Sequence, residues 1–588
     1  MTPSNCAVMF TPPLSACATG RLAARNDVSL IDASYQIQIR VNWQDVDAET
    51  YSNGTATCKP AERTIMKVLL SLISFVALAA CQQSAPPVEP ETDSVVRPAF
   101  SLATDEAYDF EKIPVYLENH QAVYNYIDGN LDSHLAAMQR WLRQPSISAQ
   151  NVGIAEMAEL VRQDLEDIGF SEAEIVPTDG HPGVWGYYDA GADKTLVVYF
   201  MYDVQPVNPE DWQSPPFAAE LIDHDLGKVI MARGATNQKG PERAFLNALE
   251  SIIAVDGTLP VNIMLTAEGE EELGSPHYPQ IVDAHEDRLR TADTVLFPFN
   301  SQRPDGTVSV ILGVKGIIYF EMIASGGEWG GPAVAEIHGS YKAIVGSPVW
   351  RLVQALSTLV SADGNTILVP GYYDDIRPPN VEESQLINAG IEQWSDQQMQ
   401  DVFGVSQWID GMTGQDAAIE LLFTTTMNID GIWGGYTGEG TKTILPHRAT
   451  AKVDSRLPPD IQPDEAMAKI RAHLDNSGFA GIKIRQLGGY PAAQTSVDAP
   501  AVQAALGVFK KYADDIAVQP RVAGSAPFYQ FTDRLGLPLV PAGLGYGTGA
   551  HAPNEIMLIE PGEGTAAAGL ADVEKAYVDF VYSLANKD

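Results

Sequence analysis

The stretch Glu268-Gly-Glu-Glu-Glu-Leu-Gly-Ser275 decides how the chain is interpreted, and it directly follows the apolar run 261–267. That run has the length of a buried strand, so the carboxylates stand at the strand's carboxyl end. Adjacent carboxylates cost free energy there unless they bind a cation or share a proton. In open α/β sheets, ligands also bind at this edge. The alternative is a solvated acidic loop in an acidic chain.

Strand and helix patterns alternate on both sides of this stretch. Residues 194–200 form a continuous apolar run, typical of a strand buried on both faces, and residues 294–297 form another. A helix is expected between them, because Pro241 suits the first position of a helix. Residues 98–150 also have a helical pattern. The alternation predicts an α/β fold with a helix-covered, mostly parallel sheet.

A second domain is predicted within the first. Between residues 313 and 488 the expected order is β-α-β-β-α-β, with strands at 316–322, 421–430, 449–456 and 481–486 and helices at 348–360 and 464–474. This order predicts an inserted α+β domain of the ferredoxin-like type. The larger domain then consists of residues 98–312 and 489–588.

Composition excludes some classes of partner. The formal net charge is -39, which argues against binding of nucleic acid or of an anionic membrane through a basic surface. The hydrophobic content of 45% is enough for full cores. All four cysteines lie at or before residue 81, so the fold after that point uses neither disulfides nor thiolate chemistry.

The N-terminal part contains a targeting pattern. Residues 66–81 begin with Met-Lys, continue with an apolar run too short to span a bilayer comfortably, and end in Leu-Ala-Ala-Cys81. The ending resembles the lipobox of bacterial lipoproteins, which implies that Cys81 is lipidated. Gln82 then implies the periplasmic side of the outer membrane. Residues 82–97 are a Pro/Ser/Glu-rich tether, and residues 1–65 are expected not to be translated.

Six further motifs occur in a fixed order. They are Tyr202-Asp-Val-Gln-Pro206, Arg233-Gly-Ala-Thr236, Lys239-Gly-Pro241, Glu268 to Glu272, Gly524-Ser525 and His551-Ala-Pro-Asn-Glu555. Together they resemble the di-zinc exopeptidase family of carnosine dipeptidase, glutamate carboxypeptidase, acetylornithine deacetylase and succinyl-diaminopimelate desuccinylase. The resemblance covers roughly residues 110–588. It implies that the larger domain is catalytic and that the inserted domain is a lid that forms a homodimer.

The resemblance implies roles for individual residues. Glu271 is the general base that takes a proton from water, and Glu272 and His551 are ligands of the second metal. Asp203 is the partner that orients the first metal's histidine. His338 is the lid histidine that reaches the neighbouring subunit's site and polarises the scissile carbonyl.

Other positions match residues that bind substrate in the family. Arg456 and Arg521 match arginines near the substrate carboxylate, a task that suits a bidentate guanidinium. Asn428 matches an asparagine of the lid, and Gly524 and Ser525 belong to the substrate-binding motif. For Arg456 a structural ion pair is an open alternative.

The departures from the family concern the metals. The family's first histidine is Met201 here, its bridging aspartate is Asn237, and its later aspartate is Phe299. A thioether is a poor zinc ligand, an amide oxygen is a weak one and a phenyl ring is none. We therefore expect one zinc at most, or none, held by Glu272, His551 and the Asn237 amide.

Two functions remain open at this point. The first is a hydrolase of the exopeptidase or amidohydrolase type that acts on a small peptide or an N-acyl amino acid. The second is a catalytically inactive family member that serves as a peptide-binding or scaffold lipoprotein. The intact surroundings of the replaced ligands, including Glu271, favour the first.

Overall fold

The computed structural model describes residues 28–32, 35–39 and 95–585. The chain divides into two compact units, Met1–Glu91 and Thr92–Asp588. In the first unit, β1 (Val28–Asp32) and β2 (Tyr35–Ile39) pair in antiparallel fashion. The lipobox and Cys81 lie outside the described residues. Over the described part of the chain, no helix combines the length and the hydropathy needed to cross a membrane.

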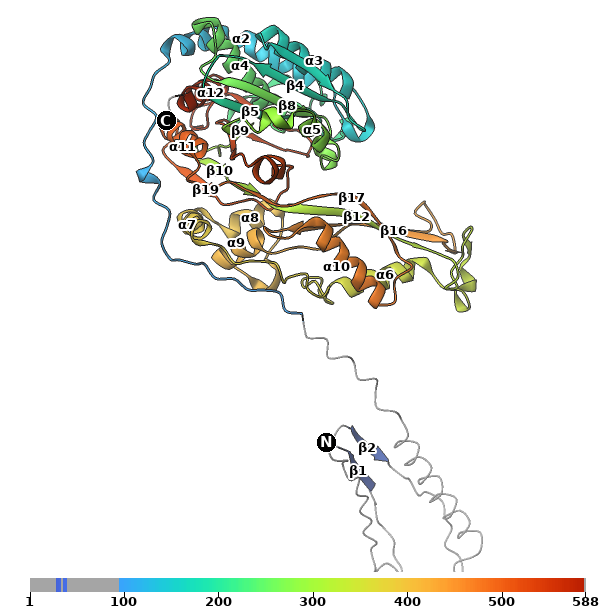
Figure 1. The fold of residues 1–588 in the computed structure, drawn as a ribbon. Coiled ribbons are helices and arrows are strands. Elements are labelled where there is room, and N and C mark those ends of the chain that lie inside the picture. The colour runs from blue at the N-terminus through green and yellow to red at the C-terminus, as the bar shows by residue number, and fades with distance from the viewer. Residues whose placement is uncertain (1–27, 33–34, 40–94, 586–588) are drawn as a thin grey trace, which may run out of the picture. The chain divides into compact units, whose positions relative to one another are not determined.

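A six-stranded sheet forms the centre of the second unit (Figure 1). Its strands, in spatial order, are β20 (Leu539–Ala542), β9 (Thr294–Pro298), β5 (Thr195–Met201), β8 (Asn262–Glu268), β4 (Gly183–Tyr188) and β3 (Glu172–Val176). The first four are parallel, and the last two are antiparallel to their neighbours. The predicted mostly parallel sheet is confirmed.

Helices cover both faces of this sheet. One face packs on α2 (Gln121–Arg143), α3 (Ile154–Ile168), α4 (Lys239–Asp256), α11 (Pro500–Tyr512) and α12 (Leu570–Ala585). The other packs on α5 (Tyr278–Leu289) and the short helix η8 (Gln530–Leu535). Along β5, Val198 and Phe200 enter the first core, whereas Tyr199 and Met201 enter the second. Period-two alternation with apolar residues on both sides produces the continuous apolar run in the sequence.

The second large sheet is antiparallel and has four strands. They are β14 (Asn428–Trp433), β16 (Arg448–Leu457), β12 (Gly316–Ser325) and β17 (Lys483–Tyr490), in that spatial order. The helices α6 (Pro348–Leu359) and α10 (Pro463–Asn476) pack on the face that carries Ile318 and Val453. Strand order and directions match the predicted ferredoxin-like domain. Ile317 and Arg456 alternate with core residues, so they lie on the opposite face.

The prediction of a helix from residue 98 is wrong for its first part. Helix α2 begins at Gln121, and the segment before it is extended apart from one 3-10 turn. Arg97, the end of the predicted tether, forms an ion pair of 3.2 Å with Glu420. Lys510 Nζ donates to the Phe110 carbonyl at 2.9 Å. Contacts with distant segments fix this extended conformation, and such contacts override the local helical pattern.

Candidate active site

Three parallel strands of the six-stranded sheet end beside one another with polar or aromatic residues. Strand β5 ends at Met201 before Tyr202-Asp203, and β8 ends at Glu268 before the Glu271-Glu272 pair. Strand β9 ends at Pro298 before Phe299. Because these strands are parallel neighbours, their carboxyl ends meet at one edge, where open α/β sheets bind ligands.

Asp203 is buried and holds the loop that follows β8. Its two carboxylate oxygens accept hydrogen bonds from the backbone amides of Glu271 and Glu272, each at 3.1 Å. Burial, with the charge of Glu272, raises the pKa of Asp203 to about 7. The family role of orienting a histidine does not apply here, because that position is Met201. Asp203 instead positions the two glutamates through their backbone.

Glu272, His551 and Asn237 come together as the sequence predicts. Asn237 Nδ2 donates to Glu272 Oε1 at 2.8 Å and lies 3.2 Å from His551 Nε2. Glu272 Oε2 lies 3.2 Å from His551 Nε2 and accepts a bond of 2.8 Å from Gln205 Nε2. The hydrogen bond to Glu272 raises the pKa of His551. Gln205 is a member of the site to which the sequence assigned no role.

Glu271 has the environment of a proton-transfer group. Its side chain is half-buried beside the carboxylates of Glu272, Asp203 and Glu268. Burial and these neighbouring charges raise its pKa well above the ordinary range. Glu268, which is buried at the end of β8, accepts hydrogen bonds from the Tyr199 hydroxyl at 2.7 Å and from the Ser275 hydroxyl at 2.9 Å. A carboxyl group with a raised pKa can take a proton and return it near neutral pH.

Glu555 holds the loop that carries Asn237. It is fully buried and accepts hydrogen bonds from the backbone amides of Gly234 at 3.0 Å, Thr236 at 2.9 Å and Asn237 at 2.8 Å. Arg233, itself buried, forms an ion pair of 2.7 Å with the same carboxylate. Arg233 and Glu555 both lie in motifs that the sequence analysis quoted, but only the structure shows that they form an ion pair. Glu555 therefore fixes the backbone of this loop, and through the backbone it sets the position of the Asn237 side chain.

Antiparallel pairing explains why these two loops meet. Strand β22 (Ile556–Pro561) begins directly after Glu555, and β7 (Gly227–Met231) ends two residues before Arg233. Ile556 pairs with Met231, which places the end of one strand beside the start of the other. The Ala232 amide also donates to the Glu555 carbonyl at 3.1 Å.

Two of the three replaced ligand positions, Met201 and Phe299, are part of the apolar packing. Met201 is buried among the residues that pack beneath α5, and Phe297 belongs to the same core. Phe299 packs on that core, with its ring centroid 6.1 Å from that of Phe297. Apolar side chains thus occupy the positions at which the family would hold its first metal.

The donor set does not fit a two-metal centre. Glu272, His551 and Asn237 supply one anion, one imidazole and one amide, and the Asn237 nitrogen faces the other two. Nowhere in residues 95–585 do three or more His, Cys, Asp or Glu side chains gather as a metal site. Two close dications need more anionic charge than one carboxylate provides.

Several predicted substrate-binding residues form one network on the face of the four-stranded sheet opposite α6 and α10. Arg456 donates to Ser525 Oγ at 2.9 Å and to Asp454 at 3.2 Å. Asn428 donates to the other oxygen of Asp454 at 3.0 Å. The carbonyl of Gly524 accepts a bond from the Lys315 amide at 2.9 Å. The structure therefore brings Asn428, Arg456 and Ser525 together.

Arg521 lies apart from this network. It is fully buried, where it is paired with Glu383, bonded to Gln494 at 2.9 Å and stacked over Phe423 at 4.3 Å. In this arrangement its guanidinium binds other parts of the chain, which does not support the expected contact with a substrate carboxylate. The buried Glu383, far away in the sequence, is the physical reason.

His338 lies on the lid and away from the cluster around Glu271. It is exposed in the short strand β13 (Ile337–His338), which pairs with β15 (Ile444–Leu445). Its ring lies 2.8 Å from Ser340 Oγ. Within the described part of the chain, no hydrogen bond or ion pair joins His338 to Glu271 or Glu272.

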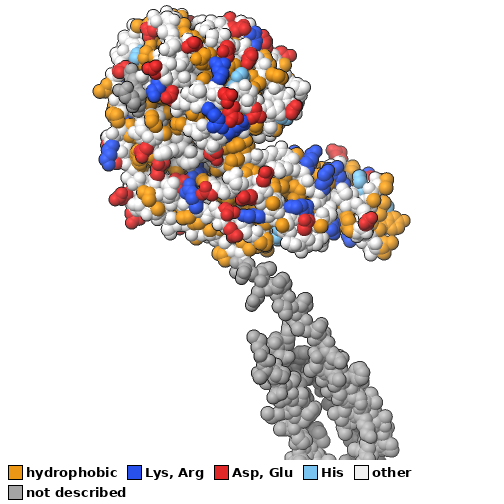
Figure 2. Space-filling view, in the orientation of Figure 1, with side chains coloured by type: hydrophobic (Ala, Val, Ile, Leu, Met, Phe, Trp, Pro, Cys, Tyr) orange, Lys and Arg blue, Asp and Glu red, His pale blue; other side chains and the backbone are white. Residues whose placement is uncertain are grey.

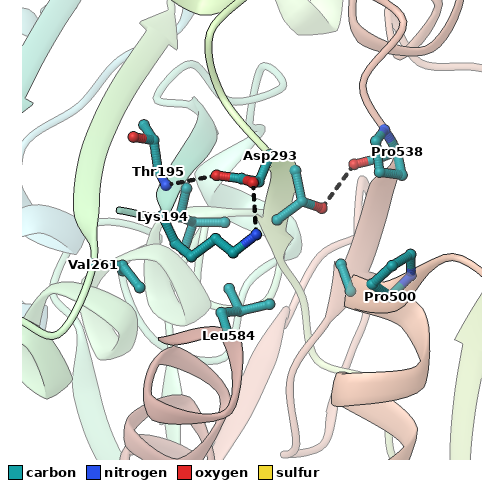
Figure 3. Close-up of a pocket in the computed structure, with 10 residues that line it drawn as sticks. Lys194, Thr195, Val261, Asp293, Pro500, Pro538 and Leu584 are labelled. Atoms are coloured by element: carbon teal, nitrogen blue, oxygen red, sulfur yellow. Dashed lines mark hydrogen bonds and ion pairs between the residues drawn. The ribbon is translucent and has the colours of Figure 1, made fainter. Parts of the chain in front are cut away.

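A small cavity marks the opposite edge of the six-stranded sheet (Figure 3). It measures about 150 Å³ and lies at the amino ends of β5 and β9. Asp293 accepts hydrogen bonds from Lys194 Nζ at 3.2 Å and from the Thr195 amide at 2.9 Å. These bonds connect the starts of the two strands, and they engage both charged side chains of the cavity, Lys194 and Asp293. The candidate site is therefore the carboxyl edge.

Comparison with known proteins agrees with this geometry. The model of Peptidase family M20/M25/M40 matches residues 198–568. The Cys-Gly metallodipeptidase DUG1 of Candida albicans is 28% identical over 375 residues, which span 60% of this chain and 73% of that protein. The human Beta-Ala-His dipeptidase is 27% identical over 386 residues, or 62% of this chain and 72% of that protein.

A solved structure extends the likeness. The M20 family metallo-carboxypeptidase Sso-CP2 of Sulfolobus solfataricus is 33% identical, with a TM-score of 0.68. The match covers 77% of this chain and 98% of that one. Human carnosine dipeptidase 1, at 23% identity and a TM-score of 0.65, shares the fold. The chain belongs to Peptidase family M20/M25/M40, a family of exopeptidases that hydrolyse amide bonds.

Proposed function

We propose that this chain hydrolyses the amide bond of a small peptide or N-acyl amino acid, with Glu271 as the proton acceptor. The observation that carries the proposal is the position of Glu271. It is half-buried at the carboxyl edge of the sheet, anchored through its backbone by Asp203, and its pKa is raised. Water attacks the amide carbon, Glu271 takes the proton, and the same carboxyl returns it to the leaving amine.

The test compares hydrolysis by the wild-type chain and Glu271→Gln on a dipeptide panel that includes Cys-Gly and β-Ala-His, which the names of two relatives specify. We expect kcat to fall by about 10²–10⁴-fold, the usual contribution of a positioned base. Substrate affinity should stay within a few fold, because glutamine has nearly the same shape. Equal rates for the two proteins would refute the role of Glu271.

The inactive peptide-binding alternative has a distinct outcome in the same assay. It requires no turnover by the wild-type chain on any panel member, with binding still measurable. The comparisons are with peptidases and lend this alternative no support.

For the metal, we propose one zinc at most, with Glu272 and His551 as its ligands and the Asn237 oxygen as a third after rotation of the amide. The support is the donor set, which contains one anion among three groups. Elemental analysis of purified protein, with activity before and after chelation, measures occupancy and dependence together. Two zinc ions per chain would contradict the proposal.

We also propose a homodimer that forms through the lid and lends His338 to the neighbouring site, where it steadies the oxyanion. Several large apolar side chains of the lid are exposed: Val334, Tyr341, Ile344, Trp350, Ile432 and Trp433. Figure 2 shows hydrophobic side chains at the far end of the lid on the face in view. Such a patch is typical of a protein interface. Mixing His338→Ala chains with Glu271→Gln chains should restore part of the activity if subunits share sites. A dimer without complementation would contradict this sharing.

Finally, we propose that Cys81 is lipidated and anchors the protein on the periplasmic side of the outer membrane. The support is the Leu-Ala-Ala-Cys sequence after a short apolar run. The intact mass of protein from the membrane fraction tests this. A peptide from residues 1–65 in that protein would contradict it.

A further inference from the structure

Residues 97–116, the N-terminal link, connect the inserted domain to the larger domain. They are extended apart from one 3-10 turn, and Figure 1 shows them in blue, passing from one domain to the other. The first half of the link contacts the excursion, which we define as residues 361–427 between α6 and β14. The excursion contains α7 (Val381–Gly390), α8 (Asp396–Phe403) and α9 (Gly414–Phe423).

Side chains hold the beginning of the link on the excursion. Arg97 forms ion pairs with Asp410 and with Glu420 of α9, the second at 3.2 Å. Phe100 and Leu102 pack against the small apolar core that α7 and α9 share. The beginning of the link therefore supplies part of the packing of the excursion as well as a cation.

Tyr108 is the residue at which the link passes from one domain to the other. Its backbone amide donates to the Gln385 carbonyl of α7 at 3.0 Å, and its hydroxyl donates to Asp498 of the larger domain at 2.9 Å. Both domains thus bind the same residue of the link.

The second half of the link is anchored firmly in the larger domain. Ile113 is buried in the main core of that domain. Lys510 Nζ of α11 donates to the carbonyls of Phe110 at 2.9 Å and Ile113 at 3.1 Å. The Tyr116 amide donates to the Gly507 carbonyl of the same helix at 2.9 Å. Core burial and backbone hydrogen bonds make this half the stronger one.

The first half of the link is held more weakly. The side chains of Arg97, Asp410 and Glu420 are 16%, 45% and 21% exposed, so water and salt screen their ion pairs. The sequence has no Lys or Arg between residues 378 and 441, so a cation for these two carboxylates has to come from another part of the chain. The link is therefore expected to detach first at Arg97.

The excursion has space beside it where it faces the larger domain. A cavity of about 520 Å³ is lined by α7, α8 and α9 on one side and by β19 (Ile516–Gln519) and residues that follow it on the other. Each residue of α8 is at least partly exposed, and Val402 and Phe403 are 80% and 63% exposed. Close-packed interiors exclude such space, so these helices have room to move here.

Helix α7 is the fixed part of the excursion. Its Glu383 is paired with the buried Arg521 of the larger domain. Its Glu382 accepts hydrogen bonds from the Ser496 hydroxyl at 2.7 Å and from the Val497 amide at 3.0 Å. Movement of the excursion therefore concerns α8 and α9 rather than α7.

From these contacts we propose that the N-terminal link is a conformational restraint on α8 and α9. Arg97, Phe100 and Leu102 hold the two helices in place, and release of these side chains lets the helices shift into the cavity beside β19. The end of the link that is released is also the end at which the predicted tether, residues 82–97, joins the fold.

The restraint has a consequence for the candidate active site. A second cavity, of about 470 Å³, is lined by Arg97, by residues of α8 and α9, and by Asn428 and Arg456 of the predicted substrate-binding network. The position of the two helices therefore controls the space beside that network. This consequence rests on the function proposed above, whereas the restraint itself does not.

Distances between spin labels test the restraint directly. All four cysteines lie at or before residue 81, so replacing them by serine frees the chain for two new labels, at Gln397→Cys in α8 and at Asp514→Cys in the larger domain. Both positions are exposed. We expect one narrow distance distribution in this parent chain and an additional, displaced distance when Arg97→Ala and Phe100→Ser are added.

Two further variants identify the cause of the additional distance. Lys112→Ala is the matched control, because Lys112 is 83% exposed and pairs only with Asp109 of the link itself at 3.4 Å among the ion pairs of residues 95–585; the distribution should stay narrow. Ala418→Trp puts a large side chain into the cavity beside β19 and should remove the additional distance from the Arg97→Ala, Phe100→Ser chain. An unchanged distribution in folded Arg97→Ala, Phe100→Ser, or the same change in Lys112→Ala, would overturn the proposal.

Hydrogen exchange of the wild-type chain gives a second test that needs no variant. Raising sodium chloride from about 0.1 M to about 1 M shortens the Debye length from roughly 10 Å to roughly 3 Å, which weakens the Arg97 ion pairs. Amides of residues 396–423 should then exchange about threefold to tenfold faster, while those of residues 108–116 stay unchanged. Equal exchange of residues 396–423 at the two salt concentrations would count against the restraint.

The restraint and the proposed catalysis fail separately. An additional distance in Arg97→Ala, Phe100→Ser together with no hydrolysis by the wild-type chain would refute the catalysis and leave the restraint in place. Hydrolysis by the wild-type chain with an unchanged distance distribution in that variant would refute the restraint alone.

Discussion

Replacement of Glu555 by glutamine should loosen the site without touching Glu271, Glu272 or His551. One buried carboxylate binds the Arg233 guanidinium and three backbone amides of the loop that ends at Asn237. A glutamine side chain keeps one acceptor oxygen, and its NH₂ group then faces N–H donors. The Arg233 charge is left buried without a counter-ion.

The magnitude follows from burial. The side chains of Arg233 and Glu555 are 3% and 0% exposed, so solvent does not screen the loss. Breaking a buried pair by removing one partner costs about 3–5 kcal/mol. That is a large share of the roughly 5–15 kcal/mol by which proteins are stable. We therefore expect a lower urea midpoint, together with reduced activity because Asn237 shifts relative to Glu272.

The assay is urea unfolding followed by tryptophan fluorescence, since Trp212 lies 5.3 Å beneath Arg233 and reports on the pair. Glu560→Gln is the matched control. It breaks the surface pair with Lys228, at 3.9 Å and 60% exposed, and should change stability by less than about 0.5 kcal/mol. Adding Arg233→Met to Glu555→Gln should recover part of the loss, because it removes the unpaired charge. A cost below about 1 kcal/mol for Glu555→Gln would refute the reasoning.

Three further predictions concern the replaced metal site. Met201→His, Asn237→Asp and Phe299→Asp together should raise zinc content, measured by elemental analysis, toward two per chain; content that does not rise would mean that these positions are not the missing ligands. Asn237→Asp alone puts a carboxylate where the amide nitrogen lies 2.8 Å from Glu272, so the urea midpoint should fall in chelator and recover with zinc. Glu272→Gln should lower the raised pKa of His551 in an NMR titration, because the carboxylate favours the charged imidazolium; an unchanged pKa would exclude Glu272 as the cause.

The fold was largely predictable from the sequence because its signals are local. Continuous apolar runs such as residues 194–200 identified the buried parallel strands, and the β-α-β-β-α-β order identified the inserted domain. The predicted helix from residue 98 failed where the local signal was weak. There, distant partners such as Glu420 and Gln385 bind the extended segment.

The candidate site was likewise predictable only in part. The association of Glu272, His551 and Asn237 was predictable through the resemblance to the di-zinc exopeptidase family, which implies that the three share one site. The burial of Arg521 was not, since its partner Glu383 lies 138 residues away. The same holds for Glu555, which binds Arg233 across 322 residues.

The sequence by itself determined the chemistry available at each position: a thioether at Met201, an amide at Asn237, a phenyl ring at Phe299 and a carboxylate at Glu271. These properties belong to single side chains and need no fold. Only the tertiary structure decided which of those groups are buried, paired or facing a cavity. Nothing in the sequence distinguishes Lys315 from other lysines, yet in the fold it is buried beside a cavity, and burial lowers its pKa to about 7. Desolvation and pairing depend on every segment that packs around a group, and those segments are far apart along the chain.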